Sequence, residues 1–238
     1  MNSFDTLPDG FELKTDILLP PDAKAGVPHP LIIAYHGGGL CGGARDCYEF
    51  LSPWLPAWAA RNNAVVLSPD YRLLPQASAK DIVDDVYSLW NWVQSSLNST
   101  LAQLPSGHHV DLSRILVEGV SAGGFTAAHL ALSHPDKIRA AILVYPMVDG
   151  FYERGDVKQT VIPTDLFLSQ EELIDSIRVE RQKKEWIVSR LPDVNTGFLI
   201  SLLQDRDAYA EAFGKGDDLA PINRINASVN GTGLPGKV

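Results

Sequence analysis

Hydrophobic residues in this chain gather in short runs separated by segments with helical periodicity. The runs, rich in Ile, Val and Leu, are Leu31–Tyr35, Ala64–Leu67, Ile115–Val117 and Ala140–Val144. Continuous apolar runs of this length are typical of strands that are buried on both faces of a parallel sheet. The segment Phe11–Leu19 precedes them and predicts an antiparallel edge strand or hairpin.

The segments between these runs predict helices at about Tyr48–Ala60, at Ala79–Leu97 and from just after Ser121 to about Ser133. In the second segment, apolar side chains recur at helical spacing. These side chains are Ile82, Val86, Leu89, Trp90 and Val93. Alternation of strand and helix predicts an α/β fold with a doubly wound, mostly parallel sheet.

The chain of 238 residues predicts a single domain, because it is long enough for one sizeable core and contains no internal repeat. Residues 1–150 carry the strand and helix pattern of the sheet core. Residues 151–215 break it with two helical stretches, Asp165–Leu191 and Asn195–Phe213, which predict a helical lid inserted above the sheet. Residues 216–238 are expected to lead back into the sheet core without completing it.

Charge and cysteine content narrow the class of protein. The net charge of -9 argues against a nucleic acid partner, because such binding draws on clustered Lys and Arg. Two cysteines, Cys41 and Cys47, are too few for a disulfide framework and are expected to stay reduced. The polar, acidic N-terminus is unlike a secretory signal, and no apolar stretch approaches the roughly 20 residues that cross a bilayer. We therefore expect a soluble, cytoplasmic protein.

The strongest chemical signal is the sequence Gly119-Val120-Ser121-Ala122-Gly123, which lies between a predicted strand and a predicted helix. Glycines two residues to either side of Ser121 permit a sharp turn that exposes the serine hydroxyl as a nucleophile. The turn also places Ser121 at a helix N-terminus, where free backbone N–H groups favour negative charge. By itself the pattern also fits an ordinary Gly/Ser-rich turn.

A second signal, His36-Gly37-Gly38-Gly39, directly follows the strand Leu31–Tyr35. Because glycines carry no side chains, their N–H groups can point into a cavity, as an oxyanion hole requires. The same residues also fit a merely flexible turn. The two motifs in this order favour a serine hydrolase in which Ser121 is the catalytic nucleophile.

These motifs resemble the hormone-sensitive-lipase-like branch of the α/β-hydrolases, the fold-3 group. The resemblance also rests on Asp70-Tyr71-Arg72-Leu73, on Trp92-Val93 and on Asp111–Ile115, and it covers about residues 11 to 150. It implies an α/β-hydrolase fold and cleavage of mainly short acyl esters, a small-molecule substrate, without metal or organic cofactor.

The resemblance also implies roles for individual residues. The oxyanion donors would be the amides of Gly38, Gly39 and Ala122, with His36, Gly37, Gly119 and Gly123 supporting the two motifs. The sequence departs from the family where Val120 replaces an acidic residue and Gln76 replaces a glutamate. Asp70 and Arg72 are expected to form a structural pair beneath the loops.

A general base is harder to find, because all six histidines lie at or before position 134. His129 and His134 lie about 12 and 20 Å along the helix that follows Ser121. His108 and His109 precede the strand and belong at its opposite end. His36 opens the glycine loop and is expected to brace it.

An acid is available in Asp149, which follows the strand Ala140–Val144, although the family places its acid one strand later. The tail Leu234–Val238 resembles the lead into that later strand. We therefore expect the last strands, and with them the acid and histidine loops, to be absent. The strand Ala140–Val144 would then have an open apolar edge, which predicts marginal stability and self-association.

Two classes of function remain, apart from a truncated gene product with no function of its own. The first is a carboxylic ester hydrolase of esterase or lipase type that is impaired by the missing triad members. The alternative is a non-catalytic module that binds a small molecule, because the same family includes plant hormone receptors that lack the triad histidine.

Overall fold

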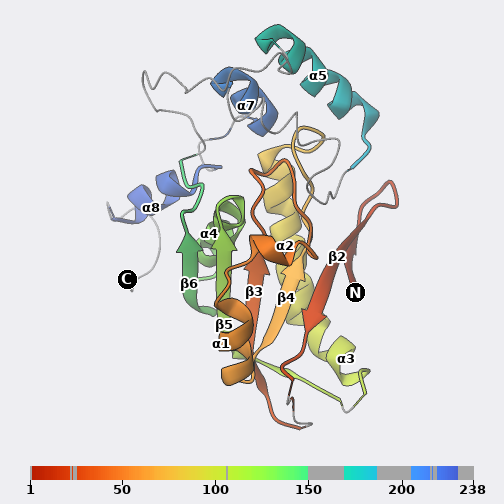
Figure 1. The fold of residues 1–238 in the computed structure, drawn as a ribbon, viewed down its shortest axis with the longest axis vertical. Helices are drawn as coiled ribbons and strands as arrows, with labels where there is room; N and C mark the ends of the chain where they lie inside the picture. The colour runs from red at the N-terminus through yellow and green to blue at the C-terminus, as the bar shows by residue number, and fades with distance from the viewer. Residues whose placement is uncertain are drawn as a thin grey trace.

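The computed structural model describes residues 2–21, 23, 26–105, 107–149, 169–186, 205–214, 216 and 219–229. Its centre is a six-stranded sheet with the strand order β1-β2-β4-β3-β5-β6 (Figure 1). The strands are β1 (Asn2–Thr6), β2 (Glu12–Leu18), β3 (His29–Tyr35), β4 (Val65–Pro69), β5 (Val110–Val120) and β6 (Ile138–Val144).

The strand directions agree with the prediction from the apolar runs. Strands β4, β3, β5 and β6 are parallel neighbours, and each contains or overlaps one of the four predicted runs. β2 pairs antiparallel with β1 on one side and with β4 on the other, so the N-terminal segment forms a hairpin at the edge. The predicted α/β class with a mostly parallel sheet is confirmed.

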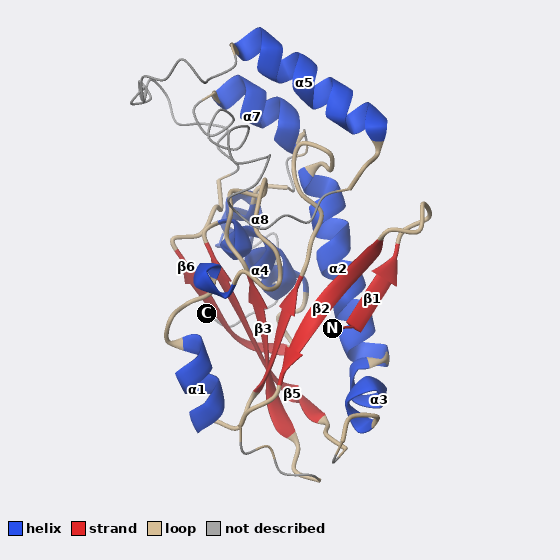
Figure 2. Ribbon diagram, turned by 45° about the vertical axis from the view of Figure 1, so that its right-hand side comes forward, coloured by secondary structure: helices blue, strands red, loops and turns tan. Residues whose placement is uncertain are grey.

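Helices cover both faces of the sheet (Figure 2). α1 (Leu55–Arg61) lies on one face, whereas α2 (Ala79–Ser95) and α4 (Ala122–Ser133) lie on the other. The remaining described helices are α3 (Leu97–Ala102), α5 (Gln170–Lys183), α7 (Arg206–Phe213), α8 (Pro221–Val229) and the 3-10 helix η1 (Tyr48–Phe50). The sheet is therefore doubly wound, as predicted.

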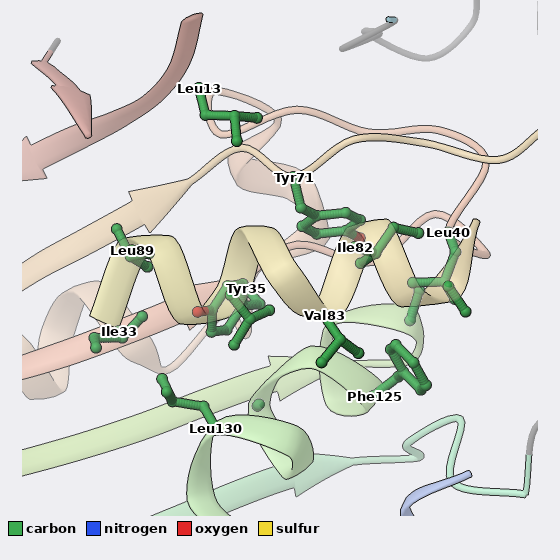
Figure 3. Close-up of a cluster of buried hydrophobic side chains, with 14 of the residues drawn as sticks. Leu13, Ile33, Tyr35, Leu40, Tyr71, Ile82, Val83, Leu89, Phe125 and Leu130 are labelled. Atoms are coloured by element: carbon green, nitrogen blue, oxygen red, sulfur yellow. The ribbon is translucent and has the colours of Figure 1, made fainter. Parts of the chain in front are cut away.

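Side chains of the central strand alternate between the two faces. Ile33 and Tyr35 of β3 belong to the large core beneath α2 and α4, whereas Ile32 and Ala34 belong to the smaller cluster beneath α1. Figure 3 shows part of the large core, with Phe125 of α4 near the side chains of α2. This double burial explains why the strand sequences are continuously apolar.

The single helix predicted over Tyr48–Ala60 is wrong. The structure has the short η1, then an extended residue at Leu51 (φ −94°, ψ 159°), and α1 begins only at Leu55. Pro53 lies between the two helices and contributes to the break, because a proline disfavours helical conformation at the residue before it, here Ser52. Apolar periodicity alone did not reveal this interruption.

Helices α5 and α7 lie within the two predicted helical stretches and stand beyond the carboxyl ends of the parallel strands (Figure 1). Arg181 of α5 joins them to the core, because it donates to the carbonyl oxygens of Pro75 at 3.2 Å and Glu211 at 3.1 Å. Residues 151–168, 187–204 and 230–238 lie outside the described part of the chain, and so does the tail Leu234–Val238. The lid and its boundaries stay a prediction.

β6 is the outermost strand of the described sheet, on the side opposite the hairpin. Its residues Arg139, Ala140 and Ala141 are exposed. Within the described ranges, no helix is both long enough and apolar enough to span a bilayer.

Candidate active site

Ser121 occupies the sharp turn between β5 and α4. Its backbone has φ 53° and ψ −113°, a conformation that is strained for a residue with a side chain. Three hydrogen bonds hold it there. The Ser121 amide donates to the Val144 carbonyl at 2.9 Å, and the Ser121 carbonyl accepts from Gly124 at 2.9 Å and Met147 at 3.0 Å. The end of β6 and the start of α4 thus fix the serine in its strained turn.

Glycine at position 123 is required by close packing of this turn against β3. A Cβ atom built on Gly123 would lie 2.1 Å from the carbonyl oxygen of Tyr35. On the other side of Ser121, a Cβ built on Gly119 would lie 2.0 Å from the Gly123 carbonyl oxygen. The spacing of these two glycines therefore has a steric cause.

The glycine loop that follows β3 lies directly against this turn. A Cβ built on Gly37 would lie 3.2 Å from the Val120 carbonyl oxygen and 3.7 Å from the Cβ of Ser121. The loop closes on itself, because the amides of Cys41 and Gly42 both donate to the Gly38 carbonyl at 3.0 Å. Gly38, at φ 117°, leaves no room for a side chain beside Gly42. The structure thus brings together the two motifs that the sequence singled out.

Three backbone amides lie at this junction without a hydrogen-bond acceptor among the described residues. Within the described part of the chain, the N–H groups of Gly38, Gly39 and Ala122 donate no hydrogen bond. Ala122 is the first residue of α4, so its N–H group has no intrahelical partner. The side chain of Ser121 is half-buried.

His36 is enclosed beneath the loop. Its ring is fully buried, stacks on Tyr71 with 4.3 Å between ring centroids, and donates from Nδ1 to the Gly37 carbonyl at 2.8 Å. The Tyr71 hydroxyl in turn donates to the His36 carbonyl at 2.9 Å. Burial lowers the pKa of His36 to about 4. His36 therefore contacts the glycine loop as a neutral, enclosed ring.

The other histidines are engaged elsewhere. His129 contacts the Leu219 carbonyl through Nε2 at 3.0 Å, and His134 stacks on Trp90 with 4.4 Å between ring centroids. His29, the first residue of β3, and His108, just before β5, form a ring pair at the amino ends of these strands. In the part of the chain that the structure describes, no hydrogen bond joins a histidine to Ser121.

Asp149 follows β6 and is half-buried. Its segment lies beside the serine turn, because the amide of Met147 bonds to the Ser121 carbonyl. The neighbouring Val148 carbonyl accepts from the amide of Ile222 at 2.9 Å. The assignment of Asp149 as an acid stays a prediction.

The expected pairing of Asp70 with Arg72 is wrong. Asp70 accepts from the backbone amide of Arg45 at 2.9 Å and forms a salt bridge with the Arg45 guanidinium. Arg72 instead binds Asp85 of α2, with 2.7 Å between Nη2 and Oδ1. The partners, Arg45 and Asp85, lie in other segments of the fold. The two-residue spacing of Asp70 and Arg72 in the sequence does not reveal them.

Two side chains that no sequence motif links to the glycine loop form hydrogen bonds with it. The Tyr209 hydroxyl of α7 donates to the Gly39 carbonyl at 3.1 Å, and the Cys41 thiol donates to the same oxygen at 3.2 Å. Gln76, noted as a departure from the family, donates to Glu180 of α5 at 3.1 Å. The contact of Tyr209 spans most of the chain, and no local motif marks it.

A mostly parallel sheet with a strained serine at the turn between β5 and α4 is the architecture of the α/β hydrolases. The chain belongs to the α/β-hydrolase fold family, whose sequence model matches residues 32–186. This confirms the resemblance to the hormone-sensitive-lipase-like, fold-3 branch.

Named relatives agree with this membership. The chain is 45% identical over 118 residues to a probable carboxylesterase of Phoma sp., a match covering 49% of this chain and 37% of that protein. It is 37% identical over 124 residues to arylacetamide deacetylase of Bos taurus, covering 49% of this chain and 29% of the relative. Each match therefore covers less than two-fifths of the relative's length.

Solved structures support the fold. An α/β hydrolase superfamily protein from Enterococcus faecalis superposes with a TM-score of 0.59 at 14% identity. The superposition covers 97% of this chain and 72% of that structure. At this identity the likeness shows the fold alone.

Proposed function

We propose that this chain carries the nucleophile and the oxyanion-binding residues of a carboxylic ester hydrolase. The observation that carries the proposal is the approach of the glycine loop to Ser121, measured by the 3.7 Å between a Cβ built on Gly37 and the Cβ of Ser121. Relatives named carboxylesterase and arylacetamide deacetylase support the substrate class, a small-molecule ester.

In the proposed reaction the Ser121 oxygen attacks the acyl carbonyl and a base accepts the serine proton. The amides of Gly38, Gly39 and Ala122 donate to the oxygen that becomes negatively charged in the tetrahedral intermediate. The N-terminus of α4 adds a favourable partial positive charge at the same place. Collapse of the intermediate releases the alcohol and leaves an acyl group on Ser121.

We infer that residues 1–238 by themselves turn over slowly. The reason is that none of the described histidines forms a hydrogen bond with Ser121, so a base for Ser121 has to come from another group. Backbone oxyanion donors alone still give residual catalysis in serine hydrolases that have lost triad members. Acyl transfer to Ser121 is therefore expected to be measurable even where release of the acyl group is slow.

The test is mass spectrometry of the protein after incubation with p-nitrophenyl acetate. We expect one acetyl group on the peptide containing Ser121, absent in Ser121→Ala and unchanged in Ser113→Ala, which alters an exposed serine. Acetylation that is equal in Ser121→Ala, or no acetylation of Ser121 at any pH up to about 9, would contradict the proposal.

The second candidate is a non-catalytic module that binds a small molecule without turnover. The observation that favours it is the enclosure of His36 and the engagement of His129 and His134 away from Ser121. A ligand that raises the melting temperature and is recovered unchanged would support this function. Consumption of the same ligand, dependent on Ser121, would favour the hydrolase.

A further inference from the structure

A pocket lies on the α2 and α4 face of the sheet, where the described part of α8 packs against α4. It has a volume of about 500 Å³, and none of the residues lining it belongs to the glycine loop or to the serine turn. Its charged lining groups include Arg224 of α8 and Lys80 of α2, and its apolar groups are Val83 and Leu219. The lining therefore includes positively charged and apolar side chains.

Arg224 is held in place by neutral partners. Its Nη2 donates to the Ser133 hydroxyl at 3.1 Å, and its Nη1 lies 3.3 Å from Nδ1 of His129. His129 Nε2 lies 3.0 Å from the Leu219 carbonyl, an acceptor, so Nε2 carries the ring proton and Nδ1 accepts from Arg224. A neutral His129 thus orients the guanidinium without neutralising its charge.

The charge of Arg224 has no carboxylate to balance it among the described residues. No Asp or Glu in those ranges forms a salt bridge with it, in contrast to Arg72, which binds Asp85. A guanidinium has five N–H donors, and the two contacts with His129 and Ser133 leave the others available.

The acidic side chain among the described lining residues, Asp84, already forms a salt bridge. Asp84 lines the pocket and binds Lys80 at 2.7 Å, so these two opposite charges offset one another. Among the described residues that line the pocket, Arg224 is therefore the charged group without an acidic partner, in a protein with a net charge of -9.

We propose that this pocket binds a small oxyanion with an apolar body, an organic carboxylate or a phosphate monoester. A guanidinium fork matches two oxygens of either group, and the apolar body would contact Val83 and Leu219. The Tyr87 hydroxyl, which shares a 2.8 Å hydrogen bond with Ser133, lines the same pocket. The proposal does not depend on ester hydrolysis, because the site lies outside the serine turn.

Isothermal titration calorimetry with benzoate, phenyl phosphate and benzamide tests whether the pocket binds an anion. Benzamide has the shape of benzoate without the charge, so we expect it to bind at least about tenfold more weakly than the preferred anion. Tighter binding of phenyl phosphate than of benzoate would assign the site to phosphate monoesters, and the reverse order to carboxylates. Absence of binding by both anions at about 10 mM would overturn the proposal.

Matched variants locate the binding. Arg224→Gln should weaken anion binding about tenfold or more, whereas Arg178→Gln, which alters an exposed arginine of α5, should leave it unchanged. Ser121→Ala should also leave it unchanged, which separates this site from the proposed ester site. Anion binding lost in Ser121→Ala and retained in Arg224→Gln would overturn the proposal.

Two further measurements apply if Arg224→Gln does not fold. Arg224→Lys keeps the positive charge but removes the planar guanidinium that can bind two oxygens at once. It should weaken anion binding severalfold. In the unmodified protein, benzoate or phenyl phosphate should shift the ¹⁵N resonances of the His129 ring and the Arg224 guanidinium. Shifts confined to residues 37–39 and 121–124 would overturn the proposal.

Discussion

The hydroxyl of Tyr209 donates a hydrogen bond of 3.1 Å to the carbonyl oxygen of Gly39. Helix α7 thereby touches the loop whose amides are the proposed oxyanion donors. The Cys41 thiol donates to the same oxygen at 3.2 Å, so this carbonyl is held from two segments far apart in the sequence. The conformation of the glycine loop therefore depends on a helix that follows it by about 170 residues.

Tyr209→Phe should lower the free energy of unfolding by about 1 kcal/mol, because one buried hydrogen bond is lost while the ring still packs. The matched control is Tyr48→Phe, which alters an exposed tyrosine and should change stability by less than about 0.5 kcal/mol. Urea denaturation measures both. Equal stability of the two variants would show that the contact with Gly39 contributes nothing.

Gly123→Ala should destabilise the protein by more than about 2 kcal/mol, because its methyl group would overlap the Tyr35 carbonyl and force apart β3 and α4. Gly10→Ala is the control, since nothing lies within 4 Å of a Cβ there and only the positive φ opposes the substitution. Its cost should be about 1 kcal/mol. Thermal unfolding of both variants tests the difference, and a smaller loss for Gly123→Ala would be inconsistent with the packing described.

Asp85→Ala and Asp84→Ala compare neighbouring carboxylates on α2. Asp85 is buried and is the close partner of Arg72, so its removal leaves that buried guanidinium with only the longer, 3.5 Å salt bridge to the more exposed Asp81 and should cost about 3 kcal/mol. Asp84 forms an exposed pair with Lys80, and its removal should cost less than about 0.5 kcal/mol. Similar denaturation midpoints for the two variants would refute the assignment of Asp85 as the partner of Arg72.

His36 should make stability fall in acid. Its pKa is about 4 in the folded chain because of burial, against about 6.5 in the unfolded chain, so the unfolded chain binds more protons between these values. Stability from this group is complete above pH 6.5 and declines as the pH falls toward 4, by up to about 1.4 kcal/mol per pH unit.

The measurement is the free energy of unfolding against pH for the unmodified protein, His36→Gln and His109→Gln. The slope between pH 6.5 and 4 should flatten in His36→Gln and persist in His109→Gln, which alters a half-buried histidine before β5. A slope that is identical in all three chains would argue against this role of His36.

Self-association through β6 stays a prediction. This strand is the outer one of the described sheet and exposes Ala140 and Ala141, so its edge can pair with a second copy of the chain. Light scattering should show mass rising with protein concentration, and Ala141→Lys should suppress the rise. A constant monomer mass over the accessible concentrations would contradict the prediction.

The local features of this protein can be predicted from its residue pattern. Strand positions followed from apolar runs, because strands buried on both faces need no polar alternation. The turn at Ser121 followed from glycines at fixed spacing, because Cβ atoms at positions 119 and 123 would overlap neighbouring backbone. Burial of a strand and the steric limits of a tight turn act on residues that are close together in the chain. Their effect is therefore visible in the order of the residues.

Contacts between groups far apart in the sequence depend on the three-dimensional packing of the elements. Arg72 binds Asp85 and Asp70 binds Arg45, whereas the sequence had suggested that Asp70 and Arg72 pair with one another. The contact of Tyr209 with Gly39 and the pocket around Arg224 likewise depend on how helices pack on the sheet. A charged or hydrogen-bonding side chain can pair with any complementary group that lies close enough. Which groups lie close enough depends on how the helices and strands pack, and no local sequence pattern encodes that packing.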